Sequence, residues 1–397
     1  MGCLPGNKID RIEYRSSFSS IGWDGITRLQ SPPTLTTYHL YPTYPTTVFF
    51  LKYFMGIHKL HEVIKENSPK AISLTQVEKY RGWKVAVDAS VVIYQTLVAI
   101  RSGAVSLKNS EGEDTSHLYG FLYKTVSILE RGITPVFVFD GAPPELKKNT
   151  LDKRRERKSN AEKLLSEAQT KEEEIKHAKQ AVRATKRHSE TAQELLKCLG
   201  VPYVVAEGEA EKTCAELNIS GRVDGVVSED MDSLTFGSRL LLKSFFASAV
   251  KKDPITEISL EKFLKDIKID HEEFVDLCIL LGCDYCESPK GVGPKKAVEL
   301  ILKHRTIEKI IEDAKIPVPE NWKYQEARAL FAQEPDENRT PLSLSTPNID
   351  ALREFLVIKN GFNKEKVEIV IQRLQKIEKS SKQKTISSFF KKQPVHK

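Results

Sequence analysis

Two aspartates, Asp230 and Asp232, follow the short apolar run 226–227 and stand two positions apart. On an extended segment this spacing places both carboxylates on one side of the chain, because the side-chain period of a strand is two. Two such carboxylates can hold Mg²⁺, which prefers carboxylate oxygen and keeps several waters for phosphate chemistry. An isolated pair of this kind is more often an acidic turn after a buried strand, so its meaning depends on acids elsewhere in the chain.

Five further acids occupy comparable places in the sequence. Two of them end the apolar stretches 84–88 and 135–140, and another follows an apolar helix predicted at 274–282. The carboxyl ends of parallel strands share one edge of a sheet, and open α/β sheets bind their ligands at that edge. We therefore expect the acids to meet there. The five are Asp88, Asp140, Glu209, Glu211 and Asp284.

Glu209 and Glu211 open a predicted helix that follows the apolar run 201–205. Acids in a first helical turn are commonly capping charges, which the helix dipole favours. Two positions apart on a regular helix, these side chains would diverge by roughly 200°. Both can serve one site only if the first turn is frayed or if a water bridges them.

The seven acids taken together make a stronger argument than any one motif. Seven carboxylates in one cleft would repel one another unless cations neutralise them. Two divalent metals about 3.5–4 Å apart would do so, and they could activate a water and stabilise the leaving oxygen of a phosphodiester. The crowding of acids therefore predicts a site with two Mg²⁺ ions that hydrolyses nucleic acid.

The elements that position these acids indicate an α/β fold. Apolar strands at 84–88 and 135–140 enclose two stretches with helical spacing, 90–100 and 117–130. Near-continuous apolar strands are typical of a parallel sheet that helices cover on both faces. Two later apolar runs add a third and a fourth strand. We predict a mainly parallel central sheet flanked by helices.

Residues 147–187 differ in character from the strands around them. They contain 14 Lys or Arg against 7 Asp or Glu, with few large apolar residues. A charge-rich helix is usually just a solvated excursion. The length and the excess of positive charge favour instead a helical arch that faces a polyanion.

A glycine hairpin at 291–294 lies between two apolar helical stretches. Gly291 and Gly293 would let the backbone approach a phosphate, and the following helix would offer free amides beside Lys295. A simple turn between two helices is the alternative. Glycines at this spacing, followed by Pro and Lys, favour the nucleic-acid interpretation and predict a helix–two-turn–helix element.

The composition is that of a basic protein that keeps many acids. The net charge is +7, charged residues make up 29% and hydrophobic residues 40% of the chain. No apolar run approaches the roughly 18 residues of a membrane span, so no membrane partner is expected. Cys283 and Cys286 form a lone Cys-x-x-Cys pair with no second pair for zinc. We therefore expect reduced thiols in an intracellular protein, without a zinc or redox role.

The two ends of the chain have the composition of disordered segments. Residues 1–54 are rich in Thr, Pro, Tyr and Ser, and residues 379–397 are basic. Two adjacent aromatics in the second segment, Phe389 and Phe390, imply a partner pocket.

The ordered motifs of the chain resemble the flap endonuclease 1 family, structure-specific 5′ nucleases of the xeroderma pigmentosum G type. The resemblance runs from about Met55 to Phe390 and rests on a set of short motifs. They are Met55-Gly56-Ile57, Val87-Asp88-Ala89-Ser90, Thr115-Ser116-His117-Leu118, Val138-Phe139-Asp140-Gly141, Glu209-Ala210-Glu211, Glu229-Asp230-Met231-Asp232 and Leu281-Gly282-Cys283-Asp284-Tyr285-Cys286.

The resemblance implies an enzyme that cuts 5′ flaps and acts as a 5′–3′ exonuclease in Okazaki-fragment maturation and long-patch base excision repair. Asp88, Asp140, Glu209 and Glu211 would serve the first Mg²⁺; Asp230, Asp232 and Asp284 would serve the second. Lys147 and Arg154 on the arch would act on the scissile phosphate. The implied DNA contacts are Tyr94, which would stack on a terminal base, Arg101, Lys124, Glu209, Gly282, Asp284, Gly291, Gly293 and Lys295.

The resemblance also implies partners and a location. The helix–two-turn–helix element often binds K⁺ in this family. Gln383, Ile386, Phe389 and Phe390 resemble the peptide that docks on the sliding clamp, proliferating cell nuclear antigen. A monomer that acts on branched DNA in the nucleolus and nucleoplasm is expected, and the composition of the amino terminus leaves room for a mitochondrial pool.

The resemblance further suggests a division of the chain. We expect a disordered extension at 1–54, an N-terminal nuclease region at 55–158, the remainder of the arch at 159–187, an internal nuclease region with the helix–hairpin–helix at 188–304, a C-terminal helical region at 305–378, and a disordered tail with the clamp-binding peptide at 379–397.

Some positions depart from the family pattern. Lys59 replaces a usual glycine, Trp83 stands where an arginine is common, and Lys124 replaces an arginine but keeps its charge. These departures bear on efficiency and not on the metal chemistry, since all seven acids are present. The rival interpretations are a related 5′-exonuclease and a DNA-binding clamp adaptor that does not cut.

Overall fold

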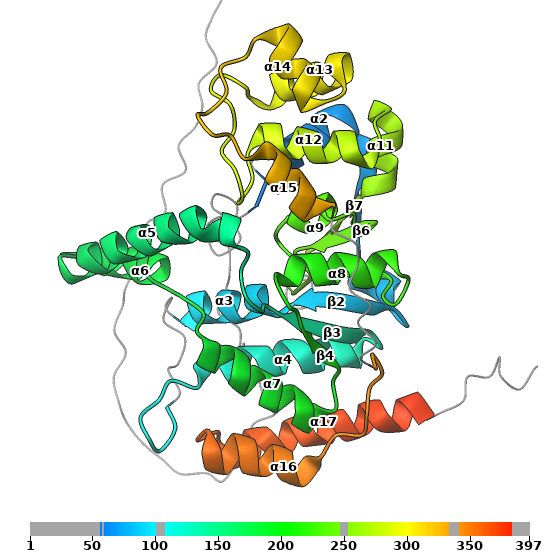
Figure 1. Ribbon diagram of the computed structural model, residues 1–397. Helices are drawn as coiled ribbons and strands as arrows, with labels where there is room; N and C mark the ends of the chain where they lie inside the picture. Colours follow the sequence, from blue (N-terminus) through cyan, green and yellow to red (C-terminus); the bar gives the residue numbers. More distant parts are fainter. Residues whose placement is uncertain (1–55, 58, 101–107, 247–252, 333–340, 383–397) are drawn as a thin grey trace, which may run out of the picture. The chain divides into compact units, whose positions relative to one another are not determined.

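The computed structural model describes residues 56–57, 59–100, 108–246, 253–332 and 341–382 (Figure 1). Several expectations concern residues outside these ranges. They are the extension at 1–54, the DNA contact Arg101 and the clamp-binding residues Gln383, Ile386, Phe389 and Phe390.

A seven-stranded sheet with the order β1-β7-β6-β5-β2-β3-β4 lies at the centre of the fold. The five strands from β6 to β4 pair in parallel, and β7 pairs antiparallel with both β6 and β1. The prediction of a mainly parallel sheet is confirmed, although three short strands, β1, β6 and β7, were not predicted. The strands are β1 (Ile72–Thr75), β2 (Lys84–Asp88), β3 (Thr134–Phe139), β4 (Tyr203–Val205), β5 (Gly225–Val227), β6 (Leu240–Lys243) and β7 (Ile255–Ser259).

Alternate residues of the strands face two separate hydrophobic clusters. In β2, Ala86 belongs to one cluster, whereas Val85 and Val87 belong to the other. This alternation follows from the period of two along a strand, and it shows that both faces of the sheet are buried. A sheet buried on both faces leaves only its strand ends for a polar site.

Two sets of helices cover the two faces. The set packed with Ala86 is α2 (Leu60–Asn67), α8 (Ala210–Ile219), α9 (Asp232–Thr235), α11 (Leu260–Ile267), α12 (His271–Leu281), α13 (Pro294–His304), α14 (Ile307–Ala314) and α15 (Tyr324–Phe331). The set packed with Val85 and Val87 is α3 (Ala89–Ile100), α4 (Ser116–Glu130), α7 (Lys186–Leu199), α16 (Ile349–Arg353), the π-helical η4 (Glu354–Lys359) and α17 (Lys364–Lys382). The 3₁₀ turns η1 (Pro69–Ala71) and η2 (Val77–Tyr80) flank β1.

The ends of two helices are informative. Gly200 is the C-cap of α7 and lies in the left-handed region with φ of 68°, which glycine adopts without strain. Helix α17 continues to Lys382, so the first residues of the segment expected to be disordered, 379–382, are helical instead. None of the helices in the described ranges is both long enough and apolar enough to cross a membrane.

The predicted arch consists of η3 (Glu145–Lys147), α5 (Lys148–Ser166) and α6 (Lys171–Gln180). Helices α5 and α6 pack against each other and project from the rest of the described residues, on the left in Figure 1. Within α5 only Ala161 is buried, and α6 buries no residue. The arch is therefore held by its two ends and not by a core of its own.

Candidate active site and DNA-facing elements

Six of the seven predicted acids follow the carboxyl ends of neighbouring parallel strands or begin the helices next to them, and the seventh, Asp284, follows the end of α12. Asp88 is the last residue of β2, Asp140 directly follows β3, and Asp230 lies in the loop after β5. We call the set of seven the acid cluster. Its buried members are Asp88, Glu209, Asp230, Asp232 and Asp284, whereas Glu211 is half-buried and Asp140 is exposed.

The segment that carries Asp230 and Asp232 is not extended, so the expected reason for their common orientation was wrong. Asp232 is the first residue of α9, and its amide donates to Oδ1 of Asp230 at 3.1 Å. The amide of Ile57 donates to Oδ1 of Asp232 at 2.9 Å. A turn and a long-range hydrogen bond, and not a strand period, bring these two carboxylates together.

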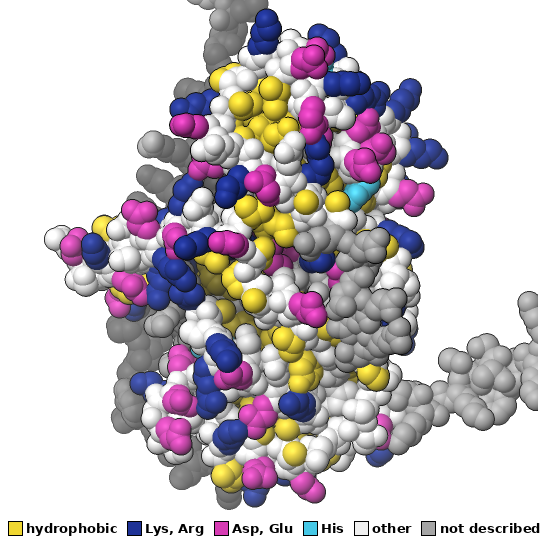
Figure 2. Space-filling model, viewed as in Figure 1, with side chains coloured by type: hydrophobic (Ala, Val, Ile, Leu, Met, Phe, Trp, Pro, Cys, Tyr) yellow, Lys and Arg dark blue, Asp and Glu magenta, His cyan; other side chains and the backbone are white. Residues whose placement is uncertain are grey.

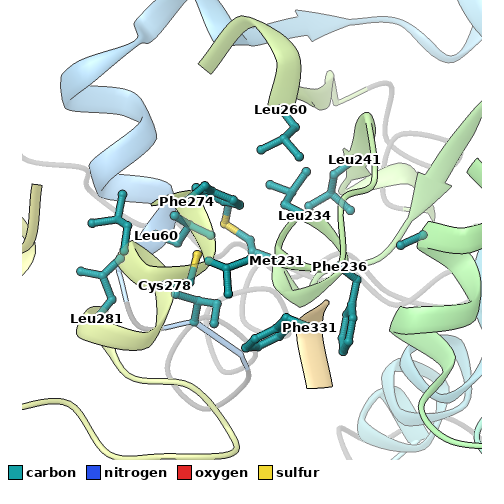
Figure 3. Packing of buried hydrophobic residues seen from close by; sticks show 14 of the residues in the cluster. Leu60, Met231, Leu234, Phe236, Leu241, Leu260, Phe274, Cys278, Leu281 and Phe331 are labelled. Carbon is teal, nitrogen blue, oxygen red and sulfur yellow. The ribbon is translucent and has the colours of Figure 1, made fainter. Parts of the chain in front are cut away.

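Short helix α9 is anchored in the core by its apolar neighbours. Figure 3 shows Met231 near Cys278 and Leu234 near Leu241 and Leu260, all within one hydrophobic cluster. The ring of Phe236 lies 5.0 Å from that of Phe331, centroid to centroid. Because close-packed cores resist displacement, this packing holds the carboxylate of Asp232 in place.

Asp88 and Asp140 are connected through the start of α3. Oδ1 of Asp88 accepts from the amide of Ser90 at 2.9 Å, and the Ser90 hydroxyl donates to Oδ2 of Asp140 at 2.5 Å. The amide of Ala210 donates to Oδ1 of Asp140 at 2.9 Å. Burial, and next the charge of Asp140, raise the pKa of Asp88 to about 8.

Glu209 and Glu211 both contribute to the cluster, which answers the question left open by their spacing. Glu209 is the N-cap of α8 with extended backbone, so the regular helical angle does not apply to the pair. Its carboxylate accepts from Lys147 and from the Tyr285 hydroxyl. Burial raises the pKa of Glu211 well above its usual value, and the charge of Asp88 raises it further.

Asp284 follows α12 and connects the cluster to the arch. Its Oδ2 accepts from Arg154 at 2.8 Å and lies 3.2 Å from the ammonium of Lys147. Its carbonyl oxygen accepts from the Thr150 hydroxyl at 2.8 Å. The two predicted catalytic cations, Lys147 and Arg154, thus contact the acids directly.

The cluster carries more negative charge than its neighbours compensate. Burial raises the pKa of Asp232 well above its usual value, and Asp230 and Asp284 raise it further, while Lys147 acts in the opposite direction. No three ligating side chains within the described ranges already surround one point as a ready metal cage. The donors are nonetheless all carboxylates, and Lys147 and Arg154 are the cations that the structure places against them. That donor set fits hard divalent cations such as Mg²⁺.

Several residues that the sequence did not single out shape this site. Gly56 has φ of +71°, and a Cβ there would collide with Oδ1 of Asp230 and of Asp232. Tyr285 is buried and donates to Glu209. Ser90 bridges two acids of the cluster. All three residues stand in motifs on which the resemblance rests, but the sequence assigned none of them a role of its own.

The glycine hairpin is open to solvent, as its predicted role requires. Gly291, Gly293 and Lys295 are exposed, and a Cβ on either glycine would meet nothing within 4 Å. Gly293 is the N-cap of α13 and no side chain caps that helix, so its first amides point to open space. Gly282 is buried at the end of α12 with φ of +96°.

Two other predicted DNA contacts, Tyr94 and Lys124, are less exposed than the hairpin. Tyr94 is half-buried on α3, and burial raises its pKa. Lys124 is half-buried on α4, donates to Oε1 of Gln95 at 2.9 Å, and lies 5.2 Å from the centroid of the Phe246 ring. Burial lowers its pKa to about 7. Its role as a DNA contact stays a prediction, and the structure adds a packing role.

Lys and Arg outnumber acids on α5, and Figure 2 shows dark blue atoms gathered near the base of the arch, with magenta acids among them along its length. Together with Lys147 and Arg154 they place positive charge beside the negative charge of the acid cluster. A phosphodiester that reached the acids would pass these cations on the way.

Two family patterns match the chain. Residues 55–161 match the XPG N-terminal domain, and residues 200–284 match the XPG I-region. The first match contains Asp88, Asp140, Lys147 and Arg154, and the second contains the remaining acids.

Whole proteins match over most of their length. The flap endonuclease 1 of Salmo salar is 45% identical over 344 residues, which cover 85% of this chain and 90% of that protein. The structure of flap endonuclease-1 from Methanococcus jannaschii is 32% identical with a TM-score of 0.62, covering 78% of this chain and 97% of that one. The catalytic core of Rad2 in complex with DNA substrate is 27% identical with a TM-score of 0.63, covering 80% of this chain and 100% of that one.

Proposed function

Because this chain belongs to the flap endonuclease 1 family, we propose that it cuts 5′ flaps from branched DNA and also acts as a 5′–3′ exonuclease. Membership in the family makes it a structure-specific nuclease. Beyond that, we propose that its substrate is a 5′ flap, that two metal ions take part in hydrolysis, and that it works in DNA replication and repair.

One observation carries the proposal most directly. The seven acids lie at one edge of the sheet, and Lys147 and Arg154 contact two of them from the arch. Acids alone would describe a metal site of any kind. The two cations add a place for a phosphate between the acids and the arch, and that combination fits phosphodiester hydrolysis.

The roles of the individual residues follow from their places. Asp88, Asp140, Glu209 and Glu211 would hold one Mg²⁺, and Asp230, Asp232 and Asp284 would hold the other. When bound, such ions supply an activated water and neutralise the developing charge on the leaving oxygen. Metal dependence is a property of the nucleases in this family.

Lys147 and Arg154 contact Glu209 and Asp284 directly. From these positions the ammonium and the guanidinium would donate to oxygens of a scissile phosphate bound beside the acids. Such donors, aimed at developing negative charge, typically contribute about 10²–10³-fold in rate.

Other elements would bind parts of the DNA that lie farther from the acid cluster. Tyr94 would stack on a terminal base, and the hairpin of Gly291, Gly293 and Lys295 would grip the duplex backbone with a bound K⁺. The exposed glycines and the uncapped start of α13 support this role, since free amides bind phosphate oxygen.

We also propose a cellular setting. The peptide Gln383, Ile386, Phe389 and Phe390 would dock on the sliding clamp, in Okazaki-fragment maturation and long-patch base excision repair. A monomer in the nucleolus and nucleoplasm, with a mitochondrial pool, would suit that work. The support is the sequence of the peptide and the family to which the chain belongs.

The experiment is cleavage of a labelled double-flap DNA with Mg²⁺. The wild-type protein should release the flap, and Asp232→Asn should bind the DNA but cut it at least about 10²-fold more slowly. Asp253→Asn is the matched control, because Asp253 is an exposed aspartate outside the acid cluster. Equal cutting by wild type and Asp232→Asn would refute the site, and binding without cutting by the wild type would favour the adaptor.

A further inference from the structure

The turn that carries Asp284 is closed by two cysteines. Sγ of Cys283 lies 3.7 Å from Sγ of Cys286, and the Cys283 amide donates to the Cys286 carbonyl at 3.3 Å. Both thiols are free and half-buried. The sequence favoured no redox role for this pair, but the fold brings the two sulfurs into contact.

We propose that Cys283 and Cys286 form a reversible disulfide that displaces Asp284 and slows DNA cleavage. Hydrogen peroxide is the oxidant. It converts one thiol to a sulfenic acid with release of water, and the second thiol attacks that sulfur and expels a second water. The pair loses two electrons and two protons. A dithiol returns them by thiol–disulfide exchange.

The distance between the two sulfurs means that forming the disulfide must move the residues between them. A disulfide has an S–S length of about 2.05 Å, so the two sulfurs must approach by about 1.7 Å. Only Asp284 and Tyr285 lie between the cysteines, and both touch other parts of the site. Asp284 accepts from Arg154, and Tyr285 donates to Glu209.

Hydrogen bonds from other elements also hold the turn and the residue that follows it. The carbonyl of Glu287, next to Cys286, accepts from Nε1 of Trp322 at 2.8 Å. The Thr150 hydroxyl of the arch donates to the carbonyl of Asp284 at 2.8 Å. Because Glu287 is held just outside the pair, closing the disulfide shifts the residues between the two cysteines; that shift strains the bond from Thr150 and reaches the Asp284 carboxylate.

The expected size of the effect follows from the tolerance of catalytic geometry. A misplacement of about 1 Å at a reacting group can cost about 10²-fold in rate. We expect oxidation to slow flap cleavage by about tenfold or more, with full recovery in a dithiol. The effect on cleavage depends on the proposed function, whereas formation of the disulfide does not.

The first measurement needs no activity. The full-length protein is treated with hydrogen peroxide, its remaining thiols are blocked with N-ethylmaleimide, and tryptic peptides are weighed. The peptide 269–290 carries both cysteines and also Cys278. It should lose two hydrogen masses, and its fragment ions should place the reagent on Cys278 and leave Cys283 and Cys286 unmodified by it. Cys283→Ser should abolish that species, whereas Cys198→Ser on α7 should not. Two thiols that stay fully blockable, or that reach only sulfinic acid, would overturn the proposal.

The second measurement is flap cleavage before and after peroxide. The wild type and Cys198→Ser should slow down and recover in dithiothreitol, while Cys283→Ser and Cys286→Ser should not respond. A disulfide that forms without any change in cleavage would overturn the coupling to Asp284. If the reduced wild type does not cut flaps at all, the proposed function fails, and the mass of the peptide still decides whether the disulfide forms.

Discussion

The acid cluster and the helical arch carry opposite charge, and they are built into the molecule in opposite ways. Five of the seven acids are buried, and they lie at the ends of strands and helices that pack into the two cores. The arch buries a single residue of α5, Ala161, and none of α6. Groups that must be placed within a fraction of an ångström use the core, whereas charges that only need to be near a polyanion do without it.

The two regions meet at few points, and those points matter most. Lys147 and Arg154 begin the arch and bond to Glu209 and Asp284, and Thr150 bonds to the backbone of Asp284. These contacts let the first turns of the arch influence the chemistry directly. Farther along, α5 has more Lys and Arg than acids and would act by electrostatic attraction, whereas α6 carries three Lys and three Glu.

A substitution that disturbs the buried acid cluster should reduce activity most. Gly56→Ala should lower flap cleavage by about 10²-fold or more, because the new Cβ would displace the carboxylates of Asp230 and Asp232. Steady-state cleavage of the double flap with Mg²⁺ measures it.

Gly221→Ala is the control for Gly56→Ala. Both glycines have φ of +71°, but nothing lies within 4 Å of a Cβ at Gly221. Both variants should lose about 1–2 kcal/mol of stability from the left-handed backbone. If Gly221→Ala loses as much activity as Gly56→Ala, backbone strain and not contact with the acids explains the loss.

A smaller effect, on stability, is expected at α7, which follows the arch in the chain and packs on α4. His117 on α4 is buried, its Nε2 lies 2.8 Å from the Thr191 hydroxyl, and its ring centroid lies 4.5 Å from that of His188 on α7. Burial, and next the proximity of His188, lower the pKa of His117 to about 3. The unfolded chain therefore binds a proton that the folded protein does not bind between about pH 6.5 and pH 3.

The sign of that difference sets the direction of the pH effect. Below about pH 6.5 the free energy of unfolding should fall by up to about 1.4 kcal/mol per pH unit from this residue, and the loss should end near pH 3. Urea unfolding from pH 7 to pH 4 should show a shallower fall for His117→Gln than for wild type. His177→Gln on α6 is the control for loss of a histidine outside this contact. Parallel slopes for His117→Gln and wild type would mean that His117 is not buried as a neutral side chain.

A substitution on the exposed surface of the arch should have the mildest consequence. Arg155 on α5 is exposed and pairs only weakly with Asp152, at 2.9 Å and i,i+3 spacing. Arg155→Gln should weaken DNA binding a few-fold, reduce the salt dependence of binding by up to about one ion, and leave cleavage of saturating DNA unchanged. Arg155→Lys should restore the salt dependence. A fall in the rate at saturating DNA would show that Arg155 touches the reaction and not only the encounter.

Much of the fold could be predicted from residue patterns because those patterns are local. Solid apolar runs such as 84–88 predict buried parallel strands, and acids at their ends must share an edge. The short strands β1, β6 and β7 escaped prediction because strands of four or five residues with mixed burial carry little periodic signal.

Sequence alone thus determined which residue types the site contains, the order of its strands and helices, and the positive charge of the arch. Tertiary structure decided which of these residues touch. The amide of Ile57 reaches Asp232 across 175 positions and Lys147 reaches Glu209 across 62. No periodicity encodes contacts at such separations, because they depend on how packed elements are set against one another. The close approach of Gly56 to two carboxylates and the contact between the Cys283 and Cys286 sulfurs, with Asp284 between them, appear only once the chain is folded.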